Sequence, residues 1–323
     1  MSGDGLKIKN AWSMQQGSAN WNKLDVWNHL IYMCGRYTRS VKIGSSFLSN
    51  TDFIHGLKKN KNLEHVRASQ LQDFETDKDA FWFIGSLPMK KLSGDLTVYE
   101  GLNKAGCQLK LDVLTITSYA DPTKALCSKN FSASEIQLFY LPIGVFIEAM
   151  EKVHRDNKLN PNLEKVKKWM ISTRDYGLPE PLLQILIMLK SISPDMEQYT
   201  MELDWPPTLN MTRLDELCTK IENLIPTIKK QWIHTPDFRL HINIKVEIPV
   251  DSELYHNFQD VKEYVRDFFN SEIEDLPMES NKIRFTTSKR IIFTEKFILD
   301  LQILIGCYPP LPPLLSSYLL CWD

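Results

Sequence analysis

A stretch with a strict two-residue alternation, Gln108 to Ile116, constrains the fold more than any other part of the chain. Leu109, Leu111 and Val113 alternate with polar residues, the pattern of a half-buried strand. The stretch from Asp95 to Tyr99 alternates in the same way, and residues 101–106 between the two are typical of a turn. We therefore expect a hairpin that places Asp95 opposite Asp112, with one apolar and one polar face.

The carboxylates on the polar face of this hairpin allow two interpretations. A rigid sheet that carries several carboxylates on an open face can hold the Mg²⁺ ions of metal-dependent chemistry. An aspartate such as Asp112 can equally be an ordinary solvated residue on the outer face of a sheet. The strand alone does not decide between them.

Composition sets the broad class of the protein. The chain has 323 residues, of which 43% are hydrophobic and 24% charged, as expected for a soluble protein of one large or two fused domains. The formal net charge of −2 neither requires nor excludes a nucleic-acid partner. The six cysteines have no zinc-site spacing, which predicts free thiols in the cytoplasm or nucleus. The most apolar run, residues 297–307, is too short to span a bilayer, so we expect no membrane span.

Periodicity predicts a sheet-rich first part, a largely helical later part and no internal repeat. Residues 51–58 are left without a type, and residues 61–78 are expected to be part helix and part loop. The expected helices are 24–34, 132–153 with a break at Pro142, 162–172, 181–191, 212–232 with a kink at Pro226, and 252–269; the expected strands beside the hairpin are 40–43, 81–84 and 239–248.

This order of elements resembles the oligoadenylate synthetase and cyclic GMP-AMP synthase branch of the nucleotidyltransferase fold. The likeness runs from about residue 21 to about residue 270 and is carried by four short motifs. They are Val41-Lys42-Ile43-Gly44-Ser45-Ser46, similar to the strand and Gly-Ser phosphate loop; Leu109-Lys110-Leu111-Asp112-Val113-Leu114, similar to the strand with the third catalytic carboxylate; Val166-Lys167-Lys168-Trp169 with Leu178-Pro179, similar to the Lys-x-Trp helix pair; and Val246-Glu247-Ile248-Pro249-Val250-Asp251, similar to the late strand before the final helix.

The resemblance implies a fold and its parts. We expect an α+β fold, with a nucleotidyltransferase-like mixed sheet followed by a helical C-terminal half. The expected parts are a flexible segment at 1–20, the sheet core at 21–130, the helical half with a late strand and helix at 131–307, and a proline-rich apolar arm at 308–323.

The resemblance also implies a site that binds Mg²⁺ and a nucleoside triphosphate. Asp112 and Asp52 would be metal ligands, with Asp95 as a further catalytic carboxylate. The phosphate loop would be either Gly44-Ser45 or Gly85-Ser86. Lys167 would point at the triphosphate; the alternative, which its cluster with Lys165 and Lys168 beside Glu164 favours, is a solvated helix face.

One departure from the family puts catalysis in doubt. Active members carry two carboxylates one residue apart after the Gly-Ser loop, whereas this chain has Ile54 after Asp52 and Thr97 after Asp95. Neither side chain is an anionic ligand for two-metal chemistry. We therefore expect a pseudoenzyme that binds a nucleotide or RNA and acts in nucleic-acid sensing or complex assembly. The alternatives are an active template-independent nucleotidyltransferase and a self-assembling structural or viral protein.

Two further regions suggest partners. Lys58, Lys59, Lys61 and Arg67 are expected to line an RNA groove or, alternatively, a solvated surface. The arm at 308–323 is too apolar for a free tail, so we expect it to pack on its own chain or to dock on a partner, in a homodimer or heterodimer.

Overall fold

A computed structural model describes residues 21–44, 51–156, 158–173, 180–205, 211–232, 238–248, 258–271, 273–279, 282–295 and 297–307. The chain divides into two compact units. The first comprises residues 1–118, 122–136 and 160–162, and the second comprises 119–121, 137–159 and 163–323. The arm at 308–323, the segment at 1–20, Ser45 and the start of the helix expected at 252–269 lie outside the described residues.

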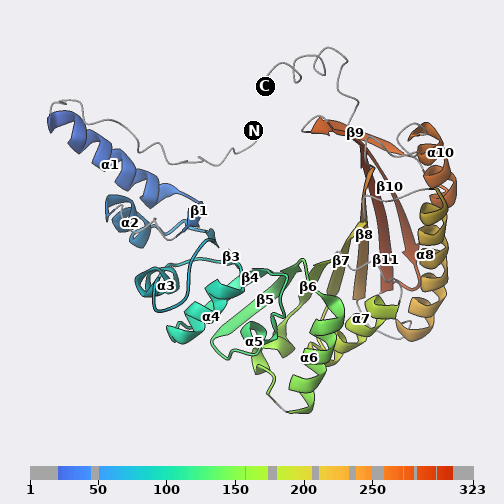
Figure 1. The fold of residues 1–323 in the computed structure, drawn as a ribbon, viewed down its shortest axis with the longest axis horizontal. Helices are drawn as coiled ribbons and strands as arrows, with labels where there is room; N and C mark the ends of the chain where they lie inside the picture. The colour runs from blue at the N-terminus through green and yellow to red at the C-terminus, as the bar shows by residue number, and fades with distance from the viewer. Residues whose placement is uncertain are drawn as a thin grey trace, which may run out of the picture. The chain divides into compact units, whose positions relative to one another are not determined.

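The first unit alternates helices and strands along the chain (Figure 1). Its strands follow one another in chain order, and β1 to β4 are parallel neighbours. The last residues of β5 belong to the second unit. The elements are α1 (Trp21–Tyr37), β1 (Ser40–Ile43), α2 (Thr51–Lys58), β2 (His65–Ala68), α3 (Lys78–Gly85), β3 (Lys91–Gly94), α4 (Leu96–Lys104), β4 (Leu109–Thr117), α5 (Thr123–Leu126) and β5 (Phe131–Phe139).

The second unit repeats this alternation and then closes with antiparallel strands. Its strand order is β6-β7-β8-β11-β10-β9, with β6, β7, β8 and β11 parallel and β10 antiparallel to both of its neighbours. Helices α7, α8 and α10 lie along one side of these strands (Figure 1). The elements are α6 (Ile143–Arg155), the 3₁₀-helix η2 (Pro161–Lys165), whose first two residues belong to the first unit, β6 (Lys168–Thr173), α7 (Glu180–Ile192), β7 (Gln198–Trp205), α8 (Met211–Trp232), β8 (Phe238–Ile248), α10 (Phe258–Phe269), β9 (Glu274–Glu279), β10 (Lys282–Ile292) and β11 (Phe297–Cys307).

Alternating burial gives the strands of each unit a covered face and an open face. In the first unit the register partners Val66 and Leu92 are fully buried, while Arg67, the next residue on β2, is exposed. Tyr99 of α4 is also fully buried, and its hydroxyl donates to the carbonyls of Leu92 and Thr115 at 3.0 and 2.6 Å. Helix α4 therefore packs on the face that carries Val66 and Leu92, and burial of each such side chain contributes about 2 kcal/mol.

Two short stretches, at the entries to β2 and β6, are nearly identical in sequence and form the same kinds of hydrogen bond. They are Asn60-Lys61-Asn62-Leu63-Glu64-His65-Val66 and Asn160-Pro161-Asn162-Leu163-Glu164-Lys165-Val166. Their first asparagines are 1% and 2% exposed. The Asn60 amide donates to the carbonyls of Gly35 and Thr38, and the Asn160 amide to those of Leu126, Ser128 and Phe131. In each stretch the Oδ1 atom accepts from the backbone N–H two residues later. The chain thus contains the same entry into a strand twice, at 60–66 and 160–166, and we call it the recurring strand entry. The expectation of no internal repeat did not include it.

The expected fold class is wrong in its C-terminal part. Strands β8, β9, β10 and β11 make up most of the described residues after residue 237, so this described part is not a helical half, and the class is α/β with a mixed sheet. The alternating burial of residues 297–303 shows why: side chains such as Leu299 and Leu301 are buried while Gln302 is exposed, which is a strand period.

Several individual elements also differ from the sequence prediction. Residues 81–84 and 96–99 are helical instead of strand, residues 132–139 and 168–172 are strand instead of helix, and β2 lies within 61–78. The run at 81–84 is apolar throughout and fits either period. The elements expected at 24–34, 40–43, 108–116, 181–191, 212–232 and 239–248 are confirmed, and residues 51–58 are helical. Among the helices that the structure describes, none is both long enough and apolar enough to cross a membrane.

Candidate binding faces

The structure does not bring together the carboxylates expected at a nucleotidyl-transfer site. Asp95 is the N-cap of α4, and its carboxylate accepts from the Val98 N–H at 3.1 Å. Asp112 lies on β4 as an exposed residue, and its N–H donates to the carbonyl of Lys90, just before β3 begins. Asp95 follows the other end of β3, so the four residues of that strand, about 13 Å, separate the two positions. The expected hairpin and its pairing of Asp95 with Asp112 are therefore wrong.

The other predicted site residues have local structural roles. Asp52 lies in the first turn of helix α2 instead of on a strand. Gly85 ends α3, where an added Cβ would lie 2.3 Å from the Cys107 sulfur, and the Ser86 hydroxyl donates to the Phe83 carbonyl at 2.7 Å. This Gly-Ser pair is thus a tightly packed helix end. Gly44 follows β1, while its neighbour Ser45 lies outside the described residues.

Lys167 lies just before β6 and forms an ion pair with Glu197. The Nζ and Oε1 atoms are 2.9 Å apart, and both side chains are about half exposed. The hydrogen bond between them raises the pKa of Lys167 and lowers that of Glu197. Because both groups are solvated, the pair contributes little to stability. Within the described ranges, no three His, Cys, Asp or Glu side chains come together in a way that could hold a metal ion.

The nucleotidyl-transfer prediction can be tested directly with purified protein, Mg²⁺ and ATP. We expect no nucleotide polymer, with or without double-stranded RNA, because Asp95 and Asp112 lie at opposite ends of β3 and cannot share two metal ions about 3.5–4 Å apart. Chromatography of the nucleotides after incubation would reveal any product. Robust product formation that disappears in Asp112→Asn would show that the carboxylates do act together.

The open face of the second unit is built from residues in register on neighbouring strands. On the opposite face Trp169, Tyr199, Leu240 and Leu299 form a row with at most 1% exposure. The next residue of each of these strands points to the open face, and these residues together with a register partner on β10 form a first row. The residues two positions further along the parallel strands, and two positions back on the antiparallel β10, form a second row on the same face. We call these two rows the polar face; they are Met170, Thr200, His241, Asp300 and Arg290, followed by Ser172, Glu202, Asn243, Gln302 and Ser288.

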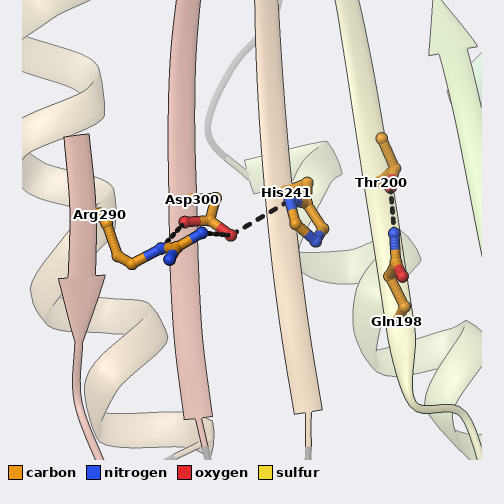
Figure 2. A network of polar contacts seen from close by, with 5 residues as sticks. All are labelled: Gln198, Thr200, His241, Arg290 and Asp300. Carbon is orange, nitrogen blue, oxygen red and sulfur yellow. Dashed lines mark hydrogen bonds and ion pairs between the residues drawn. The ribbon is translucent and has the colours of Figure 1, made fainter. Parts of the chain in front are cut away.

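Hydrogen bonds across strands hold the centre of the polar face (Figure 2). Arg290 donates from Nε to Asp300 Oδ1 at 2.5 Å and from Nη2 to Oδ2 at 3.3 Å, a two-pronged contact. His241 Nδ1 lies 3.4 Å from Asp300 Oδ2. On β7 the Gln198 amide donates to the Thr200 hydroxyl at 3.3 Å (Figure 2). The contacts of Arg290, Asp300 and His241 join side chains of three neighbouring strands, β10, β11 and β8, while the Gln198–Thr200 bond orders a pair within β7.

The electrostatics of this cluster keep His241 neutral near pH 7. Burial of the ring lowers the pKa of His241, Asp300 opposes that shift, and the charges of Arg239 and Arg290 reinforce it. Because Nδ1 faces a carboxylate oxygen, we assign the ring proton to Nδ1, which leaves Nε2 as a hydrogen-bond acceptor. Next to the cluster, Lys245 and Glu202 form a second cross-strand pair at 2.9 Å.

His241 should make the protein less stable in mild acid. Because the pKa of His241 is lowered on folding, the unfolded chain binds the proton more tightly, so its contribution is intact above about pH 6.5 and is lost as the pH falls toward the folded pKa. Urea unfolding at about pH 7.5 and about pH 5 measures this difference. His241→Gln should lose less stability than the wild type between the two pH values, and an equal loss would contradict the assignment.

The open face of the first unit carries a different set of side chains. Lys42 and Arg67 are register partners on β1 and β2, and His65 and Lys91 are partners on β2 and β3. We call these four residues the basic face. Lys42, Arg67 and Lys91 are exposed, and His65 Nε2 lies 2.8 Å from the Ser93 hydroxyl. Burial lowers the pKa of His65, and the nearby charges of Arg67 and Lys91 lower it further.

Sequence reasoning found only part of these surfaces. The strand at 239–248 was predicted with one solvated face, which contains His241 and Asn243. The polar positions of β6, β10 and β11 were missed, although Asp300 and Gln302 interrupt an apolar run at the strand period. Arg67 was expected in a basic groove with Lys58, Lys59 and Lys61, but those three lie at the end of α2 and in the following loop, not on the sheet.

Comparisons with known proteins give no family for this chain. No family, no curated protein and no solved structure matches it. The nucleotidyltransferase resemblance stays a prediction, and so do its Mg²⁺ and nucleoside triphosphate. Of its motifs, 109–114 lies on a strand as expected, whereas Lys168 and Trp169 begin a strand instead of lying on a helix. What the chain does must therefore be inferred from the geometry of the strands in its two units.

Proposed function

We propose that this protein is a non-enzymatic scaffold that binds a protein partner on the polar face of its second unit. The observation that carries the proposal is the row of in-register side chains held across β7, β8, β11 and β10, with the Arg290–Asp300–His241 contacts at its centre. In the first unit and in the β6-β7-β8 part of the second, strand and helix alternate and parallel strands stack in chain order, as in leucine-rich-repeat solenoids. That likeness is one of architecture and supports a binding role by analogy.

The polar face has the physical properties of a recognition surface. Its central side chains are already ordered by hydrogen bonds and by the strand ladder, so a partner immobilises less on binding. Next to the cluster, the facing residues Ile298 and Ile292 add apolar surface, and Ile292 is 65% exposed. Methionine and arginine, both enriched in protein interfaces, occur together in the first row as Met170 and Arg290.

Photo-cross-linking from two single positions tests this proposal. A photoreactive residue in place of Ser288 lies exposed in the second row of the polar face, while one in place of Ile187, 41% exposed, lies on helix α7. In extracts of the source cells we expect a discrete adduct from position 288 and none from position 187. Adducts from position 187 alone, or the same adducts from both, would contradict the proposal.

A further inference from the structure

The basic face concentrates positive charge on a small area. Neighbouring strands lie about 4.8 Å apart and alternate residues of one strand about 6.7 Å apart. Lys42, His65, Arg67 and Lys91 therefore fall within an area of roughly 10 by 7 Å. Burial lowers the pKa of His65, which lies between these cations, and the charges of Arg67 and Lys91 lower it further.

The basic face and the polar face differ in how their charges are balanced. On the polar face Arg290 pairs with Asp300, and Lys245 with Glu202. Among the described residues, no acidic side chain forms an ion pair with Lys42, Arg67 or Lys91. The positive charges of the basic face are therefore left for an acidic group of another molecule to balance.

The two units also differ in the sign of their formal charge. The first unit contains 17 Lys and Arg against 12 Asp and Glu, a formal charge of +5, and the second contains 21 against 28, a formal charge of −7. The local field of the first unit therefore attracts an acidic ligand to the basic face, even though the chain as a whole carries −2.

The neighbours of the basic face favour a protein segment over a nucleic acid. In register with it on β3 and β4 lie Ser93, Val113 and Thr115, which are small or β-branched. Sheets that bind single-stranded nucleic acid stack bases on aromatic rings, and the described strands β1 to β3 and the register-paired part of β4 carry no Phe, Tyr or Trp. The ring on these strands is that of His65, which is partly buried and lies 2.8 Å from the Ser93 hydroxyl. Methyl groups beside cations are instead suited to an extended peptide with alternating carboxylates. The distance between successive carboxylates of such a peptide matches the distance between alternate residues on one strand of the sheet.

We propose that the basic face binds an acidic, extended segment of a partner protein, whose carboxylates pair with Lys42, Arg67 and Lys91. This site lies on strands of the first unit, whereas the polar face lies on strands of the second, and the proposal stands or falls independently of the function proposed above.

Peptide binding to the full-length protein tests the proposal. The probes are a fluorescent eight-residue peptide of alternating Glu and Ser, its Gln-Ser counterpart and an eight-nucleotide oligouridylate. We expect the Glu-Ser peptide to bind, to weaken as NaCl rises from about 50 to about 200 mM, and to outcompete the other two probes. Fluorescence anisotropy gives the affinities.

Matched charge-reversal variants locate the site. The double variant Arg67→Glu, Lys91→Glu should weaken binding of the Glu-Ser peptide about tenfold or more. Lys104→Glu, Lys124→Glu makes the same charge change in the same unit, at exposed positions on α4 and α5, and should leave the affinity within about twofold. The neutral pair Arg67→Gln, Lys91→Gln should weaken binding by an intermediate amount, and it keeps the test informative if the reversed variant fails to fold.

Two results would overturn the proposal. Equal weakening by the sheet and helix variants would show that only the overall charge of the unit matters. Tight binding of the oligouridylate with no binding of the Glu-Ser peptide would make the basic face a nucleic-acid site, as the sequence predicted for Arg67. Neither result bears on cross-linking from Ser288, so the two proposals fail separately.

Discussion

Replacing Asn160 by alanine is expected to lower the free energy of unfolding by about 3 kcal/mol, one of the two largest losses that we expect from a single substitution. The amide of Asn160 donates to three carbonyls, those of Leu126, Ser128 and Phe131, and the residue is 2% exposed. Alanine leaves those carbonyls without this donor, in a place that water reaches poorly. It also removes the acceptor of the Asn162 N–H.

Asn130 offers a matched control for this prediction. It is only partly buried, and its side chain bonds only to other polar side chains, Asn103 and Gln108, among the contacts that the structure resolves. Asn130→Ala should therefore cost well under half as much, about 0.5–1 kcal/mol. Urea unfolding of the two variants gives both values. Equal losses would mean that the recurring asparagine does not anchor the strand entry.

Replacing Trp169 by alanine is expected to cost about 4 kcal/mol. The ring is 1% exposed on the covered face of β6, and its Nε1–H donates to the Ser193 hydroxyl at 3.0 Å. That hydroxyl donates in turn to the Leu163 carbonyl at 2.7 Å, so the substitution leaves a cavity and a disturbed hydrogen-bond chain. Trp169→Phe keeps most of the volume and should cost less than half as much.

The neighbouring residue supplies the control. Met170 lies next to Trp169 on the strand and points to the polar face, where it is only partly buried. Met170→Ala should therefore cost about 1 kcal/mol or less in urea unfolding. A helix at 162–172, as the sequence predicted, would not separate two adjacent residues onto opposite faces. Similar losses from both substitutions would favour that helix over strand β6.

Strands with one solvated face were predictable because their two sides differ chemically. The pairs Leu111 with Asp112 and Ile242 with Asn243 show the alternation that identified β4 and β8. The run at 81–84 has no such contrast, and only tertiary packing makes it a helix with Trp82 half exposed. The stretch at 95–99 alternates, but a short alternation fits the first turn of a helix as well as it fits a strand. In the structure Asp95 is the N-cap of helix α4.

The recurring strand entry could be recognised in the sequence, but the polar face could not. The two Asn-x-Asn-Leu-Glu-x-Val stretches at 60–66 and 160–166 are a direct repeat signal. The contact between His241 and Asp300, by contrast, depends on β11 pairing with β8 across an intervening helix and two strands. Nothing in the local pattern of either strand specifies that register, so the cluster emerges only from the assembled sheet.

The most direct test of the scaffold function is the affinity of the cross-linked partner for two matched variants. Thr200→Arg places a long charged side chain in the first row of the polar face, and Ile187→Arg places the same side chain on helix α7. Isothermal titration should show binding weakened about tenfold or more, equivalent to about 1.4 kcal/mol, for Thr200→Arg and unchanged within about twofold for Ile187→Arg. Unchanged affinity for Thr200→Arg together with a loss for Ile187→Arg would place the partner on the helices and contradict the account.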